Sequence, residues 1–322
     1  MALATSALGR SGVRVTRLGL GTAPLGGLYT SVEEAQARAV VRRALDLGVG
    51  YVDTAPQYGH GTAERRVGAA LAGVERGSYV LSTKVGRLVV PRPDGDTGTF
   101  ADAPPSDVVF DFSADGVRRS LEESLDRLGV DRVDVAYVHD PDDHADEAIR
   151  TAYPVLHELR AQGVVGAIGV GMNSTAIPTR FVRETDVDVV LLAGRWTLLD
   201  RSGGVELLPA CLERGVSVVV GGVYNSGVLA DPRAGAHFDY APAPEPVVAA
   251  AARMAGLCAA HGVPLKAAAL QFPYRHPAVA SVLTGARSVA ELEENLRMLA
   301  TPVPAPLWAE LEGAALVPGG RR

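Results

Sequence analysis

Short runs of apolar, largely β-branched residues recur along the chain, with longer segments between them. Eight of these runs lie at 18–22, 50–54, 79–84, 133–139, 164–171, 187–193, 216–222 and 279–285. Hydrophobicity within a run is continuous rather than alternating, as is typical of a strand that is covered on both faces. The pattern therefore predicts eight buried strands.

Segments with helical periodicity lie between these strands. In 32–47 the apolar residues gather near one side, Ser31 and Glu34 predict a capping box at the start, and Gly48 predicts the end. The same pattern recurs at 113–129, 143–163 and 288–299. Strands that alternate with helices pair in parallel, so eight such units predict an α/β fold with a closed (β/α)8 barrel, the TIM barrel.

Three segments fall outside this alternation. Residues 7–17 predict a short hairpin that turns at Ser11 and Gly12 and plugs the bottom of the barrel. Residues 91–112, after the third strand, and 229–246, after the seventh, are rich in Pro, Gly and Asp and too long for simple connectors. We expect both to be irregular loops over the C-terminal mouth that shape a substrate site.

Length and composition fit a single barrel. At 322 residues the chain can hold one barrel, which commonly reaches about 250 residues or more, or two smaller domains. No linker separates two halves, so we expect one domain over 1–322. Hydrophobic residues make up 47% and charged residues 21%, a balance that supports a large core and excludes a disordered chain.

Charge and cysteine usage restrict the partners and the compartment. The net charge is -6 and no basic run forms a phosphate-binding patch, so we expect no nucleic-acid partner. No segment approaches about 18 uninterrupted apolar residues, and the first residues do not resemble a signal peptide, so we expect no membrane contact. Cys211 and Cys258 predict buried free thiols, which favours a reducing compartment, the cytoplasm. The sequence does not predict an oligomeric state.

Four polar residues lie at or just after the ends of consecutive predicted strands, where the loops of a barrel enzyme carry its chemistry. Asp53 ends the second strand and Tyr58 follows in its loop, Lys84 ends the third, and His139 ends the fourth. Taken singly, these residues are consistent with a cap, a packing residue, a surface charge and a core histidine. Together they favour a site, because a lysine at the inner end of a buried strand needs an anion such as Asp53.

These residues carry a resemblance to a known family. Asp53 and Tyr58 in DTAPQYG, Lys84 in STKVG and His139 in YVHD resemble the catalytic tetrad of the aldo-keto reductases. The resemblance runs from GLGTAPLG at 19–26 to GARSVAELEENL at 285–296. It implies hydride transfer between a nicotinamide dinucleotide and a carbonyl or sugar hydroxyl carbon of a small-molecule substrate, a sugar or an aldehyde.

The resemblance also implies a role for each residue. Tyr58 is the general acid or base, although a free phenol, with a pKa near about 10, exchanges a proton poorly at neutral pH. Lys84 stabilises its phenolate, and Asp53 keeps Lys84 in place and charged. His139 orients the substrate oxygen by a hydrogen bond. No metal is expected, since Pro141 breaks the helical register of HDPDDH at 139–144, and Asp143 is interpreted as a helix cap.

The cofactor site follows from the resemblance alone, because the chain has no G-x-G-x-x-G motif after a strand. The resemblance implies a cofactor extended across the barrel mouth. The residues that match such a site are Thr22, Asp53, Asn173, Gly222, Tyr224, Gly285, Arg287 and Asn295. Asn173 would bind the carboxamide, and the last three would hold the adenosine part.

The chain departs from the family pattern at several of these positions. Ala193 replaces a frequent Gln, and Gly221 replaces a frequent aromatic residue, for which Tyr224 or Trp196 is a candidate substitute. Glu291 stands where NADP-preferring relatives often carry Arg, so we expect NAD, while Arg287 leaves NADP open.

Four motifs together resemble one branch of the family: GTAPLGGLY at 21–29, VHDPD at 138–142, LLAGRWTLLD at 191–200 and GGVYNSGVL at 221–229. This branch contains the L-fucose and D-threo-aldose 1-dehydrogenases and pyridoxal 4-dehydrogenase. This implies oxidation of a cyclic hemiacetal hydroxyl to a lactone, with a pyridoxal 4-dehydrogenase or a general aldehyde or ketone reductase as alternatives. Two other classes stay open. Lys84 could form a Schiff base in a lyase or aldolase, or the chain could bind the cofactor as a regulatory protein without turnover.

Overall fold

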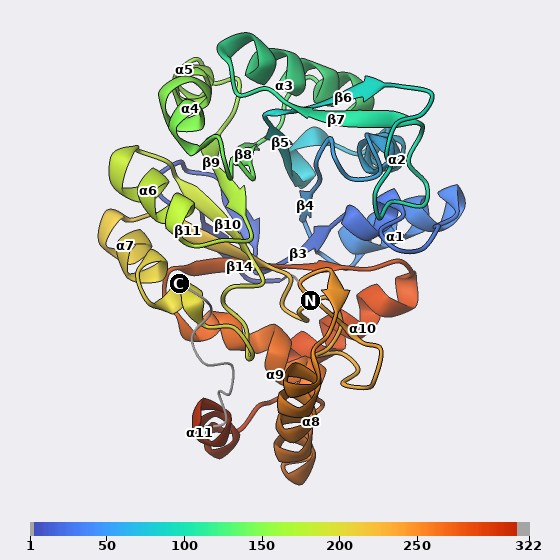
Figure 1. Ribbon diagram of the computed structural model, residues 1–322, viewed down its shortest axis with the longest axis vertical. Helices are drawn as coiled ribbons and strands as arrows, with labels where there is room; N and C mark the ends of the chain where they lie inside the picture. The colour runs from blue at the N-terminus through green and yellow to red at the C-terminus, as the bar shows by residue number, and fades with distance from the viewer. Residues whose placement is uncertain (1–2, 314–322) are drawn as a thin grey trace.

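The computed structural model describes residues 3–313, and a closed barrel of eight parallel strands forms its centre (Figure 1). The barrel strands are β3 (Leu18–Gly21), β4 (Tyr51–Asp53), β5 (Val80–Val85), β8 (Val135–His139), β9 (Ala167–Met172), β10 (Val189–Ala193), β11 (Ser217–Gly221) and β14 (Val279–Gly285). They pair in chain order, and β14 closes the barrel against β3. The eight predicted strands and the barrel are confirmed, with shifts at the strand ends.

Helices surround the strands on the outside (Figure 1). They are α1 (Glu34–Asp46), α2 (Thr62–Leu71), α3 (Ala114–Leu128), α4 (Ala145–Glu147), α5 (Tyr153–Ala161), α6 (Ala176–Glu184), α7 (Leu207–Arg214), α9 (Leu265–Gln271) and α10 (Val289–Ala300). Two more, α8 (Glu245–Ala260) and α11 (Ala305–Gly313), extend below the barrel in this view. Ser113 and Ser288 cap α3 and α10 as predicted, each accepting a hydrogen bond from a backbone N–H.

Two predicted caps are wrong, and one predicted helix is interrupted. The Ser31 hydroxyl donates to Asp102 instead of capping α1, whose N-cap is Glu33. Asp143 does not cap α4, which follows His144. The segment predicted as a helix at 143–163 contains a π-helical turn at Ala148–Ala152, directly before α5. Pro154 in the first turn of α5 has no N–H to donate, which accounts for the altered hydrogen bonding there.

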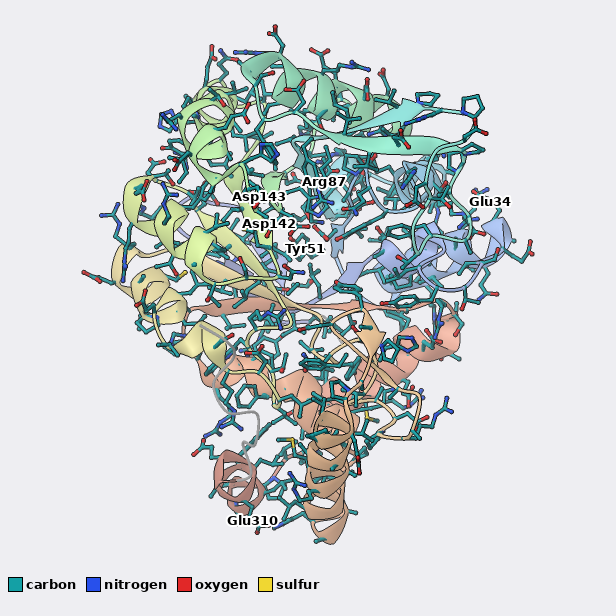
Figure 2. All side chains as sticks on the ribbon, viewed as in Figure 1. Glu34, Tyr51, Arg87, Asp142, Asp143 and Glu310 are labelled. Carbon is teal, nitrogen blue, oxygen red and sulfur yellow. The ribbon has the colours of Figure 1, made fainter. Side chains whose placement is uncertain are left out.

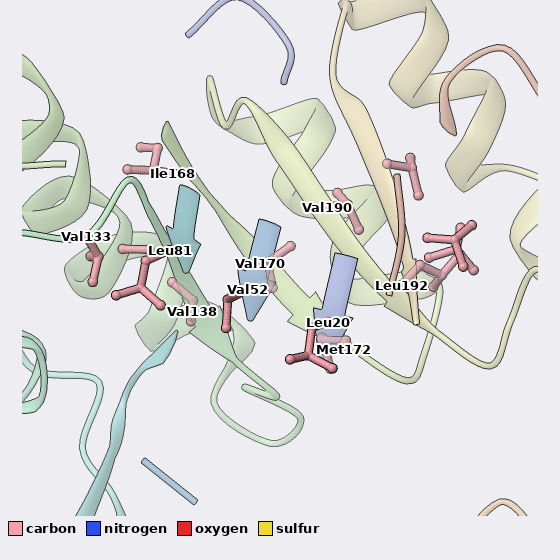
Figure 3. Close-up of a cluster of buried hydrophobic side chains, with 14 of the residues drawn as sticks. Leu20, Val52, Leu81, Val133, Val138, Ile168, Val170, Met172, Val190 and Leu192 are labelled. Carbon is pink, nitrogen blue, oxygen red and sulfur yellow. The ribbon is translucent and has the colours of Figure 1, made fainter. Parts of the chain in front are cut away.

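Side chains along each strand alternate between the barrel interior and the helical shell. Leu20, Val52, Leu81, Val170 and Leu192 belong to the outer cluster that packs against the helices (Figure 3). A second cluster fills the lower interior and contains Tyr51, Val135, Tyr137, Val189, Leu191, Val219 and Leu283. Because the period is two, the same strands present Asp53, Lys84 and His139 to the interior at their C-terminal ends.

A hairpin closes the bottom of the barrel, as predicted. β1 (Thr5–Ala7) pairs antiparallel with β2 (Arg14–Thr16). The fully buried Leu8 and Val15 join the cluster inside the barrel. Gly9, in a left-handed conformation, donates its N–H to Ser217 Oγ at 2.8 Å, which attaches the hairpin to the start of β11.

The first segment predicted as an irregular loop, 91–112, holds the second strand of a hairpin that begins at Arg87, and the second, 229–246, contains a whole hairpin. β6 (Arg87–Pro91) pairs with β7 (Ser106–Phe110), and β12 (His237–Phe238) pairs with β13 (Ala241–Pro242). Phe100, between β6 and β7, lies 6.3 Å from the Tyr58 ring, measured between ring centres. Residues 230–240 line the cavity described below. Both segments therefore border the barrel mouth, as expected, but they are more ordered than predicted.

Two further observations concern the rest of the chain. Cys211 and Cys258 are buried free thiols, as predicted. Within residues 3–313, no single helix has the length and apolar character needed to cross a membrane; by length and composition alone, one pair bent by 103°, Glu245–Ala260 with Leu265–Arg275, passes that test.

Candidate active site

Lys84 and Asp53 form the buried centre of the site. Lys84 Nζ lies 2.8 Å from Asp53 Oδ2 and 2.9 Å from the Thr54 carbonyl oxygen, and both charged residues are 2% exposed or less. Burial opposes a charge on Lys84, but Asp53 and Tyr58 together outweigh the burial and raise the pKa of the ammonium group. Lys84 is therefore a fixed, permanently protonated cation.

Tyr58 lies directly over this cation. Lys84 Nζ is 4.6 Å from the centre of the Tyr58 ring. Burial raises the pKa of Tyr58 above that of a free phenol, and the positive charge of Lys84 opposes the rise. The phenol is therefore protonated at neutral pH, next to a cation that stabilises the phenolate once its proton is given up.

A close backbone contact fixes the loop that carries Tyr58. Gly59 has a φ of 60°, and a Cβ atom there would clash with the carbonyl oxygen of Gly26. A Cβ on Gly26 would in turn meet the Tyr58 backbone. Glycine at both positions lets the β4–α2 loop pack against the loop after β3, and this contact sets the height of the phenol over the barrel.

His139 completes the predicted group at the end of β8. Its ring is edge-on to Tyr58, with 6.1 Å between ring centres. Burial, together with the positive charges of Arg87 and Lys84, holds the pKa of His139 well below its ordinary value. The imidazole is therefore neutral, and a neutral ring donates a hydrogen bond from one nitrogen only. The structure brings all four predicted residues together.

A hydrogen-bonded layer beneath the site was missed by sequence reasoning. Ser82 Oγ donates to Asp53 Oδ1 at 2.7 Å and lies 3.2 Å from the Tyr51 hydroxyl, which is 3.0 Å from that of Tyr137. These residues precede Lys84, Asp53 and His139 by two positions, so they face the same interior. Polar residues two positions before a strand-end candidate were the available signal.

A second charged pair beside His139 was also missed. Arg87, the first residue of β6, donates from Nη2 to Asp140 Oδ2 at 2.8 Å. The same carboxylate oxygen lies 3.5 Å from His139 Nε2. Arg87 also donates to the side chain of Gln57, in the Tyr58 loop. Asp142, which Figure 2 labels together with Arg87, also acts on the guanidinium through its negative charge.

A cavity of about 980 Å³ opens above these residues. All eight residues predicted to bind the cofactor line it, and Tyr58 lines it as well. Lys84 and His139 are not among the lining residues, because they are only 1% and 5% exposed. The cavity therefore runs from the predicted adenosine end, at Arg287, to the phenol.

The cavity floor is suited to a flat, extended ligand. Gly21 and Gly221 line it, and a Cβ atom on either would meet no protein atom closer than 3.7 Å. These glycines therefore leave bare backbone facing an open space that side chains would otherwise occupy. Asn173 lies at the end of β9 with an exposed side chain, and Thr22 is held by its hydroxyl, which donates to the Asp53 carbonyl. The residues present fit a dinucleotide cofactor.

Of the two candidates for the missing aromatic residue, only Tyr224 lines the cavity. Its hydroxyl donates to Asn295 Oδ1 at 2.9 Å, while Asn295 Nδ2 donates to the Gly285 carbonyl. Trp196 instead donates to the Pro273 carbonyl and packs on Phe272. Trp196 therefore packs against a further hydrophobic cluster, which includes Leu198, Met254 and Phe272, and does not line the cavity.

The predicted adenosine end of the cavity is rich in carboxylates. Glu291 Oε2 accepts a hydrogen bond from the Arg287 N–H at 2.8 Å, at the start of α10. Glu294 pairs with Lys266 at 2.5 Å, and all four residues line the cavity. The Arg287 backbone N–H and the side chains of Arg287 and Lys266 are therefore already paired with carboxylates. An additional phosphate at this end would need the same groups.

The HDPDDH segment does not assemble a metal site. His139 points into the barrel, whereas the ring of His144 stacks on Phe110, 5.6 Å away between ring centres. Among the residues that the structure describes, no group of three or more His, Cys, Asp or Glu side chains could hold a metal ion.

An eight-stranded parallel barrel with a phenol, an ammonium, a carboxylate and an imidazole at its C-terminal end defines the class of (β/α)8-barrel enzymes. Residues 17–315 match the aldo/keto reductase family, and the chain belongs to it. Accordingly it is an oxidoreductase that uses a nicotinamide cofactor and acts on CH–OH or C=O groups of small molecules.

The most informative relatives match nearly the full chain. It is 42% identical to a D-threo-aldose 1-dehydrogenase from Pseudomonas sp, with 96% of each chain covered. It is also 42% identical to a pyridoxal 4-dehydrogenase from Microbacterium luteolum, with 97% of each covered. Among solved structures, an aldo-keto reductase from Bacillus halodurans in its holo form is similar, with a TM-score of 0.76, 26% identity and 98% of each chain covered.

Proposed function

We propose that the chain is an NAD-dependent aldose 1-dehydrogenase, which oxidises the anomeric hydroxyl of a cyclic sugar to a lactone. The observation that carries this proposal is the contact between Lys84 Nζ, Asp53 and the ring of Tyr58. The similarity to a D-threo-aldose 1-dehydrogenase supports the substrate class. The bound cofactor accepts or donates the hydride, and the residues of the chain handle the proton.

In oxidation, Tyr58 accepts the proton of the substrate hydroxyl, and in reduction it returns that proton to the carbonyl oxygen. Lys84 stabilises the phenolate form, and Asp53 prevents Lys84 from moving toward the substrate. His139 would donate a hydrogen bond to the reacting oxygen, which would orient the substrate. The residues that would hold the cofactor line the cavity: Thr22, Asp53, Asn173, Gly222, Tyr224, Gly285, Arg287 and Asn295.

The Schiff-base alternative is disfavoured by the state of Lys84. A nucleophilic lysine must be neutral and able to reach a carbonyl carbon. Here the ammonium group is buried, donates to Asp53 and the Thr54 carbonyl, and has a raised pKa. The Lys84–Asp53 pair also argues against a regulatory protein without turnover. A protein that only binds the cofactor does not require a buried ion pair next to a phenol.

Replacing the phenol hydroxyl tests the mechanism. We expect Tyr58→Phe to lower kcat for both directions by about 100- to 10,000-fold, because the proton relay is lost, while NAD binding stays close to wild type. Stopped-flow absorbance of the reduced nicotinamide measures the loss of kcat, and fluorescence titration measures the affinity for NAD. Tyr153→Phe is the matched control, since the Tyr153 hydroxyl donates to Asp186 outside the cavity. Near-normal turnover by Tyr58→Phe would falsify the mechanism.

We infer a preference for NAD over NADP from the carboxylates at the adenosine end. Glu291 holds the Arg287 N–H and repels a 2′-phosphate. Glu291→Gln should therefore raise kcat/KM with NADP relative to NAD by about tenfold. Glu293→Gln is the control on the same helix, because Glu293 pairs with Arg43 and does not line the cavity. An unchanged ratio in Glu291→Gln would rule out this basis for selectivity.

A substrate panel separates the remaining alternatives. L- and D-aldoses, pyridoxal and simple aldehydes would be tested with both dinucleotides. Oxidation of aldoses supports the proposal, whereas turnover of pyridoxal or simple aldehydes alone would assign the chain to the alternative activities. We also propose a cytoplasmic location, which the two buried free thiols support.

A further inference from the structure

Arg87, which is buried, and Asp140, which is partly exposed, form a charged pair that the proposed mechanism does not use. The side chains are 9% and 24% exposed, and the Nη2–Oδ2 distance is 2.8 Å. Asp140 follows His139 directly and adopts a left-handed φ of 39°, which is unusual for a residue with a side chain. Its N–H donates to the Gly171 carbonyl at 2.9 Å, so this conformation is held by the end of β9.

The pair has unused hydrogen-bonding capacity. Arg87 Nε is buried and has no partner within the described part of the chain. Asp140 Oδ2 accepts a hydrogen bond from Arg87 and lies 3.5 Å from His139 Nε2. Asp140 Oδ1 accepts no hydrogen bond from the described residues, 3–313. His139 Nδ1 is also buried without a partner. Arg87 Nε and His139 Nδ1 are enclosed, whereas the Asp140 side chain is 24% exposed, so Asp140 Oδ1 can accept a hydrogen bond from a polar ligand.

The position of the pair defines which ligand group it can meet. In the proposed function, the reacting oxygen lies between Tyr58 and His139. Asp140 Oδ2 is 3.5 Å from His139 Nε2 and 2.8 Å from Arg87 Nη2. In a sugar, the oxygen on the neighbouring carbon is about one hydrogen-bond length from the reacting oxygen, so it falls within reach of this carboxylate.

We propose that Arg87 and Asp140 form a specificity-determining site that binds the hydroxyl on the carbon next to the reacting carbon. This inference rests on the proposed function. A hydroxyl both donates and accepts, which matches a carboxylate acceptor beside a guanidinium donor. A substrate without this hydroxyl makes no hydrogen bond to Asp140 Oδ1 and is discriminated against. A simple aldehyde or a 2-deoxy sugar is therefore a poor substrate.

The test compares L-fucose with 2-deoxy-L-fucose, and then the best aldose of the panel with its 2-deoxy form. We expect wild-type kcat/KM to favour the 2-hydroxy sugar by about 10- to 100-fold. In Asp140→Asn and Arg87→Lys the ratio should fall toward one, mainly through loss on the 2-hydroxy sugar. Asp134→Asn is the matched control: Asp134 pairs with Arg76 just before β8, at the opposite end of the strand from Asp140.

The outcomes distinguish this inference from the proposed function. A wild-type ratio near one, with aldoses oxidised and Tyr58→Phe inactive, overturns the inference and leaves the proposed function intact. Equal losses on both sugars in the two variants also overturn it, because they indicate that the pair only supports the fold. If no aldose is oxidised, both fail. Melting temperatures identify variants that lose structure, and the wild-type ratio still tests the inference in that case.

Discussion

At the scale of single residues, position in a strand determined what could be predicted. Asp53, Lys84 and His139 were identifiable because charged or titratable residues at the ends of buried strands need a partner. Ser82, Tyr51 and Tyr137 were not identified, because hydroxyl-bearing residues are common in strands and carry no charge. Arg87 was missed for another reason: only the β6–β7 hairpin, absent from the predicted elements, turns it back toward Asp140.

The shifted pKa values of Tyr58 and His139 predict the pH dependence of both directions. The pKa of Tyr58 is raised, so the protonated phenol that reduction needs persists through neutral pH and is lost only in the alkaline range. Oxidation needs the phenolate, so its rate should keep rising with pH. His139 stays neutral because its pKa is depressed, and it should add no change near its ordinary value of about 6.5.

Profiles of kcat/KM from mildly acidic to strongly alkaline pH measure this dependence. A deuterated substrate identifies the range in which hydride transfer limits the rate. An oxidation rate that reaches its plateau below neutral pH would contradict the raised pKa of Tyr58.

At the scale of elements, repeated patterns were predicted well and isolated turns were not. The strands and α3 followed from apolar runs and from caps such as Ser113. Residues 91–112 and 229–246 were predicted as irregular because Pro and Gly interrupt them and no buried face imposes alternation. Their hairpins are exposed in part, as Phe110 and Tyr240 illustrate. Ser31 does not cap α1, because its hydroxyl donates to Asp102, which is distant in sequence.

The β4–α2 loop offers a test of how strictly Tyr58 must be placed. We expect Gly59→Ala to lower stability by about 1–3 kcal/mol, because the new Cβ atom clashes with Gly26 and the φ of 60° is strained. Displacement of the phenol should also lower kcat by about 100-fold.

Chemical denaturation and steady-state kinetics measure these two effects. Gly73→Ala is the control, because Gly73 also has a positive φ, 75°, but a Cβ atom there has nothing within 4 Å. If both variants lose stability while both keep wild-type kcat, the close contact with Gly26 does not position the phenol.

At the scale of the whole molecule, the alternation of strands and helices predicted the barrel, because eight consecutive strand–helix units with doubly covered strands are typical of a closed parallel sheet. The cavity could not be predicted. Its walls combine Gly21 from β3, Ala193 from β10 and Tyr240 from the β12–β13 hairpin, and their juxtaposition depends on loop conformation. The single domain over 1–322 stays a prediction, since it extends beyond the described residues at both ends.

The β1–β2 hairpin, which closes the lower end of the barrel, also restricts the route by which a proton can leave the site. Beneath Asp53, the hydroxyls of Ser82, Tyr51 and Tyr137 form a chain that ends among apolar side chains. Leu8 and Val15 separate that end from water. These hydroxyls can hold the Asp53 carboxylate in place, but they cannot conduct a proton to bulk solvent. Protons exchanged at Tyr58 must therefore pass through the cavity at the upper end of the barrel, which substrate and product also use.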